Sequence, residues 1–301
     1  TLNASKGAAV QSKRVQADRA FYKLYMKKVL ENTENLTLKQ AQITDIRFDP
    51  NGRVESVVTA LGAIYEVKAA IICSGTYLRS RTITGEAVCE EGPDSMQSAK
   101  ELSEHLKDAG IKLMRFKTGT PPRVHRDTID FSRLEIQYGD TDNIPFSVHT
   151  DRAQYDAIEQ IPCHIVYTNE KTHEIIRENL HRSPLFGGVI EGTGPRYCPS
   201  IEDKVVRFAD KERHQLFVEP MGYDTEEMYI QGFSTSLPTD VQHEMLASLD
   251  GFKNAEIMRY AYAIEYDCCD PTQLLATLEF KEIEGLYGAG QFNGTSGYEE
   301  A

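Results

Sequence analysis

Apolar residues recur at helical spacing near the beginning of the chain, where they predict a helix over residues 12–30. Its apolar stripe comprises Val15, Tyr22, Tyr25, Met26 and Val29. Three apolar runs follow, at residues 36–48, 54–61 and 64–74, and a turn of the type Asp-Pro-Asn-Gly separates the first two. Runs of this length with a tight turn between them predict an antiparallel meander of three strands.

The third run ends in an apolar stretch that is followed by a glycine. The letters AAIIC form an almost unbroken apolar stretch, and Ser74, Gly75 and Thr76 follow directly. Such a stretch is typical of a strand that is buried on both faces. A glycine at the exit of such a strand suits a nucleotide-binding crevice.

A second helix is predicted over residues 94–109. Asp94 can cap it, Gln97 completes a capping box, and Gly110 ends it. The side chains expected to face inward are those of Met96, Ala99, Leu102 and Leu106. The two prolines in KTGTPPR, residues 117–123, are expected to interrupt regular structure.

The pattern of predicted secondary structure changes between residues 125 and 274. Short strands and turns alternate there with two helices, predicted at residues 170–181 and 239–249. The earlier pattern of a strand with a glycine-containing exit returns afterwards, with a short strand at residues 286–290 and a glycine-rich loop. We therefore predict that residues 1–124 and 275–301 belong to one domain, into which residues 125–274 are inserted as an α+β domain.

Composition narrows the class of protein. The chain has 301 residues, 40% of them hydrophobic, and a formal net charge of −13. That acidity argues against a general nucleic-acid coat, although a local basic patch can still bind nucleic acid. No run of 18 apolar residues and no signal peptide is present, so we expect a soluble, intracellular protein without membrane contact. The six cysteines form no C-x-x-C pair and the eight histidines show no ligand spacing, so reduced thiols and no metal site are expected.

Cys198 lies two residues before a predicted helix start. Ser200 and Asp203 form a capping pattern there, followed by an apolar face of Val205, Val206, Phe208 and Ala209. A helix N-terminus, together with nearby Arg196, Lys204 and Arg207, favours the thiolate form of a cysteine. The alternative is a small buried side chain at a structural turn, and the residues alone leave both open. The same amides would also suit a phosphate group, although an ordinary solvated cap is the simpler interpretation.

The glycine-rich stretch GAGQFNGTSGYEE, residues 288–300, lies between a predicted strand and a predicted helix. Gly294 and Gly297 would let the backbone approach a flat ligand. Together with the earlier glycine exit, the stretch predicts a dinucleotide crevice, with a plain turn as the alternative. Basic residues also cluster at residues 79–81 and 117–126, where solvated loops are the commoner explanation.

Several stretches carry a resemblance to a known family. They are GTYLRSRTITGE, FKTGTPPR, TNEKTHEIIRENLHRSPL, VIEGTGPRYCPSIEDKVVRFAD, STSLPTDVQ and GQFNGTSGYEEA, and they extend over most of the chain. With them the chain resembles the glucose-inhibited division protein A family of tRNA-modifying flavoenzymes. Members of that family begin with a G-x-G-x-x-G flavin fingerprint and finish with a helical region. The resemblance therefore implies that the sequence is a central piece of such a protein. Residues 2–12 match the family segment at which this piece begins.

The fold that the resemblance implies is α/β: a two-dinucleotide-binding-domain flavoprotein of the glutathione reductase type with an inserted α+β domain. It implies FAD contacts from Ile43, Gly75, Thr76, Ser98, Gln291, Asn293, Gly294, Thr295, Ser296 and Gly297. It implies an NAD-binding segment of Gly194, Pro195, Arg196, Tyr197, Cys198, Pro199, Ser200, Ile201, Glu202, Asp203, Lys204, Val205, Val206, Arg207 and Phe208. The expected tRNA contacts are Arg79, Arg81, Lys117, Arg123 and Arg126.

The resemblance also implies a reaction in the cytoplasm. NADH would reduce FAD, and a carbon from methylenetetrahydrofolate would reach carbon 5 of the wobble uridine of certain tRNAs, completed as a (carboxymethyl)aminomethyl group. Cys198 would be a catalytic thiol. Members of the family have a second cysteine near their N-terminus, and the resemblance leaves open which of the two thiolates adds to carbon 6 of uracil. The family forms homodimers that pair with a GTPase partner in a heterotetramer. Two alternatives stay open: a folate- and FAD-dependent tRNA uracil methyltransferase, and a non-catalytic tRNA-binding scaffold.

Overall fold

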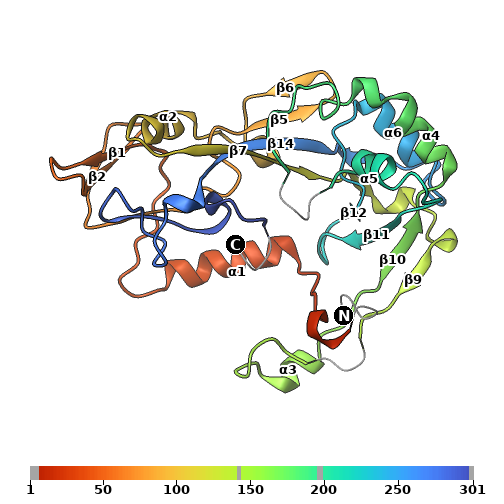
Figure 1. The fold of residues 1–301 in the computed structure, drawn as a ribbon. Coiled ribbons are helices and arrows are strands. Elements are labelled where there is room, and N and C mark those ends of the chain that lie inside the picture. The colour runs from red at the N-terminus through yellow and green to blue at the C-terminus, as the bar shows by residue number, and fades with distance from the viewer. Residues whose placement is uncertain (1–6, 141–143, 195–198, 298–301) are drawn as a thin grey trace.

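A computed structural model describes residues 7–140, 144–194 and 199–297. Figure 1 shows an elongated molecule, with the strands β1 and β2 at one end and the strands β9 to β12 at the other. The two longest strands, β7 (Leu113–Thr120) and β14 (Tyr262–Cys269), run between the two ends. Each end has its own hydrophobic core.

The predicted meander is confirmed in its order and direction. Strands β1 (Ile43–Phe48), β2 (Val54–Thr59) and β3 (Ile64–Glu66) pair antiparallel in that order. The third predicted run, however, divides into two strands. Its second part, β4 (Ala70–Ile72), leaves the meander and pairs parallel with β15 (Leu286–Gly288), the short strand predicted near the end of the chain.

The stretch AAIIC is not buried on both faces, which corrects the prediction. Within it only Ile72 is buried, whereas the side chain of Ile71 is 65% exposed. Strand β4 pairs only with β15 among the described residues. A face that no element covers leaves an apolar strand exposed, whatever its composition.

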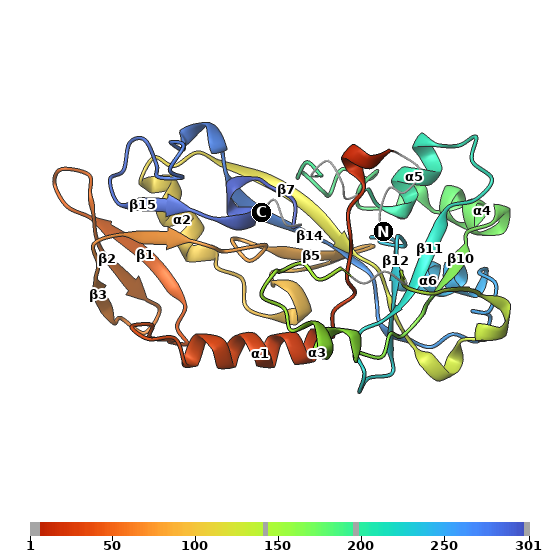
Figure 2. The ribbon, with the colours of Figure 1, turned by 90° about the horizontal axis from the view of Figure 1, so that it is seen from below.

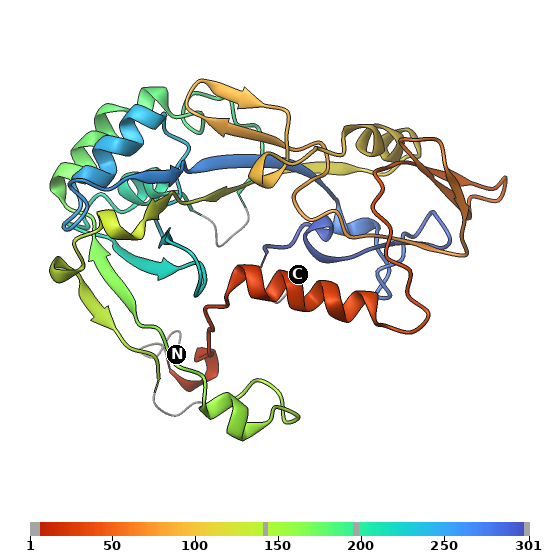
Figure 3. The ribbon, with the colours of Figure 1, turned by 180° about the vertical axis from the view of Figure 1, so that it is seen from behind.

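The first helix is shorter than predicted, and its apolar stripe is exposed. Helix α1 (Arg19–Glu31) begins after Asp18, whose carboxylate accepts a hydrogen bond from the Phe21 amide. None of its side chains is buried, and Tyr22 and Tyr25 of the stripe are 60% and 56% exposed. Figures 2 and 3 show α1 along the outside of the molecule. Helical spacing predicted the helix correctly, but among the described residues nothing covers its apolar face.

The second helix also begins later than predicted. Helix α2 (Lys100–Asp108) has no side-chain cap, and neither the Asp94 cap nor the Gln97 capping box forms. Asp94 instead has a φ of +54° and faces arginines from distant segments. Met96 therefore lies before the helix and is 58% exposed. The predicted end is confirmed, because Gly110 follows α2 with a φ of +85°, a conformation that favours glycine.

The prolines at residues 121 and 122 separate two strands instead of interrupting structure throughout residues 117–123. Strand β7 continues to Thr120, and β8 (Arg123–His125) begins immediately after the prolines. Strand β7 lies in a four-stranded antiparallel sheet of order β6-β5-β14-β7, with β5 spanning Arg81–Thr84 and β6 spanning Ala87–Cys89.

The other end of the molecule is an antiparallel sheet of order β13-β8-β12-β11-β10-β9. Its remaining strands are β9 (Glu135–Gln137), β10 (Cys163–Tyr167), β11 (Gln215–Pro220), β12 (Glu227–Gln231) and β13 (Ile257–Arg259). The helices are α3 (Arg152–Asp156), α4 (Glu170–Glu178), α5 (Ile201–Arg207) and α6 (Thr239–Ala247). Helices α4 and α6 confirm the two predicted there, and together with α5 they cover the core beside the sheet (Figure 1).

The division of the chain at residues 124 and 274 stays a prediction. The larger core draws its residues from 124 to 257, whereas β14 pairs with β5 and β7 in the four-stranded sheet. No helix formed by the described residues combines the length and the apolar character that a membrane span requires.

Two isoleucines on strands test this account of burial. Ile230 on β12 is fully buried, so Ile230→Ala should lower the free energy of unfolding by about 2–5 kcal/mol. Ile71→Ala, the matched control on β4, should stay within about 0.5 kcal/mol. Urea unfolding of both variants measures the difference, and equal losses would contradict the assignment of the core.

Candidate functional site

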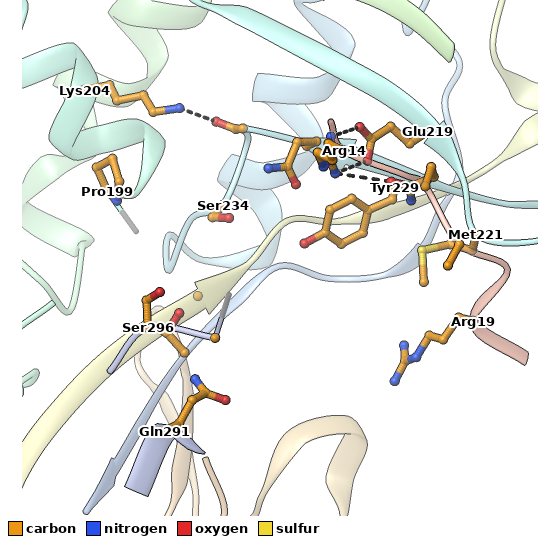
Figure 4. A pocket seen from close by; sticks show the side chains of 17 residues that line it. Arg14, Arg19, Pro199, Lys204, Glu219, Met221, Tyr229, Ser234, Gln291 and Ser296 are labelled. Carbon is orange, nitrogen blue, oxygen red and sulfur yellow. Dashed lines mark hydrogen bonds and ion pairs between the residues drawn. The ribbon is translucent and has the colours of Figure 1, made fainter. Parts of the chain in front are cut away.

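A cavity of about 610 Å³ joins segments that are far apart in the sequence. We call it the loop cavity (Figure 4). Pro199 and Lys204 line it from the predicted NAD-binding segment. Gln291, Ser296 and Gly297 line it from residues 288–297, the described part of the glycine-rich stretch, which we call the flavin loop. The remaining lining residues are Arg14, Gln16, Ala17, Arg19, Thr118, Gly119, Glu219, Met221, Tyr229, Gln231, Gly232 and Ser234.

The flavin loop is folded back on its own strand. After β15 the chain forms a 3-10 turn, η8 (Gly290–Asn293), and leaves it through Gly294 at a φ of +75°. The Asn293 side-chain amide donates to the carbonyl of Gly288 at 2.9 Å. A Cβ at Gly288 would lie 2.2 Å from the Asn293 Oδ1, so the close turn requires glycine there.

A buried ring and a further hydrogen bond also stabilise this turn. Phe292 is fully buried, and the Thr295 hydroxyl donates to the carbonyl of Gly290 at 3.3 Å. With this support Gln291 and Ser296 reach the loop cavity (Figure 4).

The other predicted flavin contacts lie outside the lining of this cavity. Gly75 and Thr76 follow β4, at the edge of the sheet where the flavin loop follows β15, because parallel strands end on the same side. Ile43 packs against a core from the meander. The Ser74 and Ser98 hydroxyls are buried without a hydrogen-bond partner among the described residues. Gly75 has a φ of +53°, and a Cβ there would meet nothing within 4 Å.

These features fit a dinucleotide that approaches the exit of β4. A buried hydroxyl without a partner is costly, so an acceptor or donor from a ligand would satisfy Ser74. The open space beside Gly75 lets a ligand reach the backbone, where a side chain would block it.

The helix start predicted at Ser200 is confirmed. The Ser200 hydroxyl accepts a hydrogen bond from the Asp203 amide at 3.3 Å and caps α5. The carboxylate of Asp203 instead lies 3.8 Å from Arg207, so Asp203 contributes its amide to the cap. The expected apolar face is only partly correct: Val205 is buried, but Val206 and Phe208 are 42% and 51% exposed, and Ala209 is also exposed.

The beginning of α5 is tied to the segment of residues 234–236. The Ile201 amide donates to the Ser234 carbonyl at 2.7 Å. The fully buried Glu202 accepts hydrogen bonds from the Ser236 amide at 3.0 Å and from its hydroxyl at 3.3 Å. Lys204 donates to the Gly232 carbonyl at 3.2 Å beside the cavity. This side of the predicted NAD-binding segment is therefore fixed.

The opposite flank is fixed by a buried carboxylate. Glu265 on β14 is fully buried and accepts hydrogen bonds from the amides of Glu191 and Gly192 at 2.7 and 2.5 Å. Arg81 donates its Nε to the same carboxylate at 2.6 Å. A Cβ at Gly192 would lie 2.8 Å from the backbone of Phe116, so the chain passes too close to β7 for a side chain.

Thr193 continues this attachment along β7. Its amide donates to the Arg115 carbonyl, and its carbonyl accepts from the Lys117 amide at 3.0 Å. Four residues of the predicted NAD-binding segment, Pro195, Arg196, Tyr197 and Cys198, lie outside the described residues. The described residues on both sides of them are anchored, and Pro199 lines the loop cavity.

The predicted tRNA contacts separate by burial. Lys117 and Arg123 are buried at 3% and 5% exposure. Arg81 donates hydrogen bonds to the Glu265 carboxylate and to the Val189 carbonyl. Arg79 and Arg126 are exposed. The five do not form one surface of free cations, because most of their charge is turned inward.

Some residues of the loop cavity were not predicted from the sequence. Arg14 forms two hydrogen bonds with the buried Glu219, at 2.7 and 3.1 Å, from an extended segment before α1 (Figure 4). Tyr229 and Ser234 also line the cavity. Ser234 lies in the stretch STSLPTDVQ, which carried part of the resemblance; Arg14 and Glu219 gave no local signal.

Comparisons with known proteins agree with one another. The family model "Glucose inhibited division protein A" matches residues 1–301. The chain is 60% identical to the tRNA uridine 5-carboxymethylaminomethyl modification enzyme MnmG of Caldicellulosiruptor saccharolyticus, and 55% identical to that of Clostridium botulinum strain Loch Maree. Both matches cover 100% of this chain and 47% of the relative, so the chain spans about half the length of these relatives.

A solved structure shows the same fold. The structure of Aquifex aeolicus GidA in its form I crystal superposes with a TM-score of 0.91 at 50% identity, over 100% of this chain and 50% of that chain. The form II crystal gives 0.90 at 48% identity. The predicted α/β fold class is thereby confirmed.

Removing the charge of Glu265 should destabilise the fold. Glu265→Gln leaves Arg81 without its buried partner and should lower the free energy of unfolding by about 3 kcal/mol. Glu191→Gln is the matched control, because Glu191 also faces Arg81, at 3.9 Å, but has a side chain that is 76% exposed. It should change stability by less than about 0.5 kcal/mol. If both variants unfold at the same urea concentration, Glu265 is not the anchor.

A histidine pair, the buried His173 and the half-buried His214, predicts sensitivity to acid. His173 on α4 is 2% exposed, contacts the Thr168 hydroxyl at 2.8 Å and lies 5.4 Å from the His214 ring. Burial lowers the pKa of both histidines, so the folded protein keeps them neutral while the unfolded chain takes up protons below about pH 6.5. Stability should therefore fall as the pH drops below about 6.5.

The variant His173→Gln should flatten this pH dependence, whereas His149→Gln, on the surface, should leave it unchanged. Urea unfolding from pH 5 to pH 8 measures the slope. A slope that survives His173→Gln at full size would show that another group causes it.

Proposed function

The chain belongs to the glucose inhibited division protein A family, and we propose that the whole protein modifies tRNA by adding a (carboxymethyl)aminomethyl group at carbon 5 of the wobble uridine. The relatives at 60% and 55% identity carry the name of this activity. The proposed cofactors are FAD, NADH and methylenetetrahydrofolate. The proposed compartment is the cytoplasm, and the proposed assembly is a homodimer that joins a GTPase partner in a heterotetramer.

The loop cavity is the observation that carries this proposal. It brings Pro199 and Lys204 to the same space as Gln291 and Ser296. A volume of about 610 Å³ falls within the range of ligand sites. The described residues thus bring the start of α5, which directly follows Cys198 and Pro199 in the sequence, to the same cavity as the flavin loop.

The residues around the cavity would hold the two dinucleotides. Gln291 and the amides near Gly294 would contact FAD, together with Gly75 at the exit of β4. The capped start of α5 and Lys204 would hold NADH, because helix amides and an ammonium group bind phosphate oxygens. FAD held by these residues would supply the reducing equivalents that NADH provides, together with the carbon derived from methylenetetrahydrofolate.

The chain's own contribution to the chemistry is a nucleophile. Carbon 5 of uracil is a poor nucleophile until a thiolate adds to carbon 6, which leaves an enolate with electron density at carbon 5. We assign this thiolate to Cys198. The start of α5 and the nearby cation of Lys204 would favour the ionised thiol. Elimination of the thiolate after loss of the proton at carbon 5 restores the pyrimidine.

Replacement of the nucleophile tests the proposal. In the whole protein, Cys198→Ser should abolish tRNA modification while the yellow flavin band remains, because the hydroxyl is not ionised at neutral pH. Cys163→Ser, a half-buried cysteine on β10, should leave modification unchanged. Mass spectrometry of digested tRNA measures the product. Modification retained by Cys198→Ser would favour a scaffold role, and a methylated uridine as the product would favour the methyltransferase.

A further inference from the structure

A second cavity, of about 450 Å³, lies next to the loop cavity. We call it the arginine cavity. Its lining includes Cys89, Asp94, Arg123, Arg259, Tyr260 and Tyr262. The guanidinium of Arg123 lies over the ring of Tyr229, 5.8 Å from its centroid, and Tyr229 lines the loop cavity. Arg19 of the loop cavity also pairs with Asp94, so the two cavities share a wall of side chains.

Arg123 is a buried cation with weak partners. Its side chain is 6% exposed, and its contacts with the Pro121 carbonyl at 3.4 Å and with Asp94 at 3.8 Å are long. Its Nε has no hydrogen-bond partner among the described residues. Asp94 is held more closely by Arg19 and, at 3.1 Å, by Arg259. A buried guanidinium with so little compensation would gain from acceptor oxygens supplied by a ligand.

The carboxylates of this cavity do not supply the missing acceptors. The oxygens of Asp94 face Arg19 and Arg259, and Glu91 accepts a hydrogen bond from the Thr82 hydroxyl at 2.8 Å. The chain has 46 acidic and 33 basic residues, so acidic side chains outnumber basic ones on it. An anionic polymer would therefore be drawn to local sites of this kind.

The rest of the lining suits a flat base. Tyr260 and Tyr262 contribute two aromatic rings, and their hydroxyls already contact the protein, at His243 (2.9 Å) and at the Asp94 amide (3.3 Å). These bonds hold the two rings at the cavity, where they form the aromatic part of its lining. Aromatic rings and arginine guanidinium planes are the surfaces on which unstacked RNA bases stack.

We propose that the arginine cavity binds one nucleotide of the single-stranded RNA segment whose neighbouring nucleotide enters the loop cavity. The inference rests on the proposed function, which supplies RNA as the substrate. Arg123 provides the donors for phosphate or base oxygens, and the two tyrosines provide the stacking surface. Arg259 is paired with Glu227 at 2.7 Å and with Asp94 at 3.1 Å, and it adds positive charge beside Arg123. The shared wall places the two nucleotides side by side, so that the nucleotide in the arginine cavity positions the one in the loop cavity.

Cys89 is a native probe of this cavity, because its thiol is exposed and lines it. The whole protein, loaded with FAD, is alkylated with iodoacetamide in the presence of an anticodon stem-loop RNA of a substrate tRNA. Mass spectrometry follows Cys89 and also Cys73, an exposed thiol outside the cavity lining, as internal control. The RNA should slow alkylation of Cys89 at least threefold and leave that of Cys73 unchanged, while NADH alone should protect neither.

A matched pair of arginines adds an independent test. Arg259 and Arg47 have side chains that are 48% and 49% exposed, and only Arg259 lines the cavity. Arg259→Gln should weaken RNA binding at least fivefold and reduce the dependence of log affinity on log salt by about 0.7, the effect of one lost phosphate contact on a single strand. Arg47→Gln should change neither quantity.

The outcomes separate this inference from the proposed function. RNA that binds and is modified while Cys89 stays freely reactive would overturn the arginine cavity as an RNA site and leave the function intact. Protection of Cys89 by NADH without RNA would assign the cavity to a dinucleotide instead. RNA that fails to bind the whole protein at all would overturn both.

Discussion

The buried carboxylate of Glu265 is the contact on which the candidate site depends most. It lies on β14, at the centre of the four-stranded sheet, and it binds both Arg81 and the backbone of Glu191 and Gly192. A buried carboxylate is stable only when its lone pairs are used, and here they fix a chain segment that has no regular structure. The segment that leads to Cys198 is thereby attached to the strand that runs between the two ends of the molecule.

The site also depends on a second attachment, at the start of α5. Glu202 provides it with its hydrogen bonds to Ser236, and Ser200 provides the helix cap. The flavin loop is held separately, by Asn293 and by the buried ring of Phe292. The start of α5 and the flavin loop are thus held by separate contacts, and residues of both segments line the loop cavity.

Local features of the fold could be predicted from the sequence, because their causes lie within a few residues. The meander, the helices α4 and α6, the cap at Ser200 and the end of α2 at Gly110 are of this kind. The predictions that were wrong concern contacts with distant residues. Asp94 has the right sequence context for a cap, but arginines from α1, β8 and β13 attract its carboxylate away from α2. The exposure of Ile71 depends on which elements cover β4, and composition does not carry that information.

The candidate site was predictable in part for the same reason. The glycine-rich loop and the segment around Cys198 have local signatures, and their resemblance to a family added residue roles. Arg14 and Glu219 meet across more than two hundred residues, so no window of sequence could have paired them.

The central claim is that the start of α5 and the flavin loop face one cavity. Anaerobic titration of the whole, FAD-loaded protein with NADH, followed by the absorbance of the flavin, tests it most directly. We expect NADH to bleach the flavin band, and we expect Lys204→Met to require a higher NADH concentration for the same bleaching without loss of FAD. Bleaching at the same NADH concentration in Lys204→Met would contradict it.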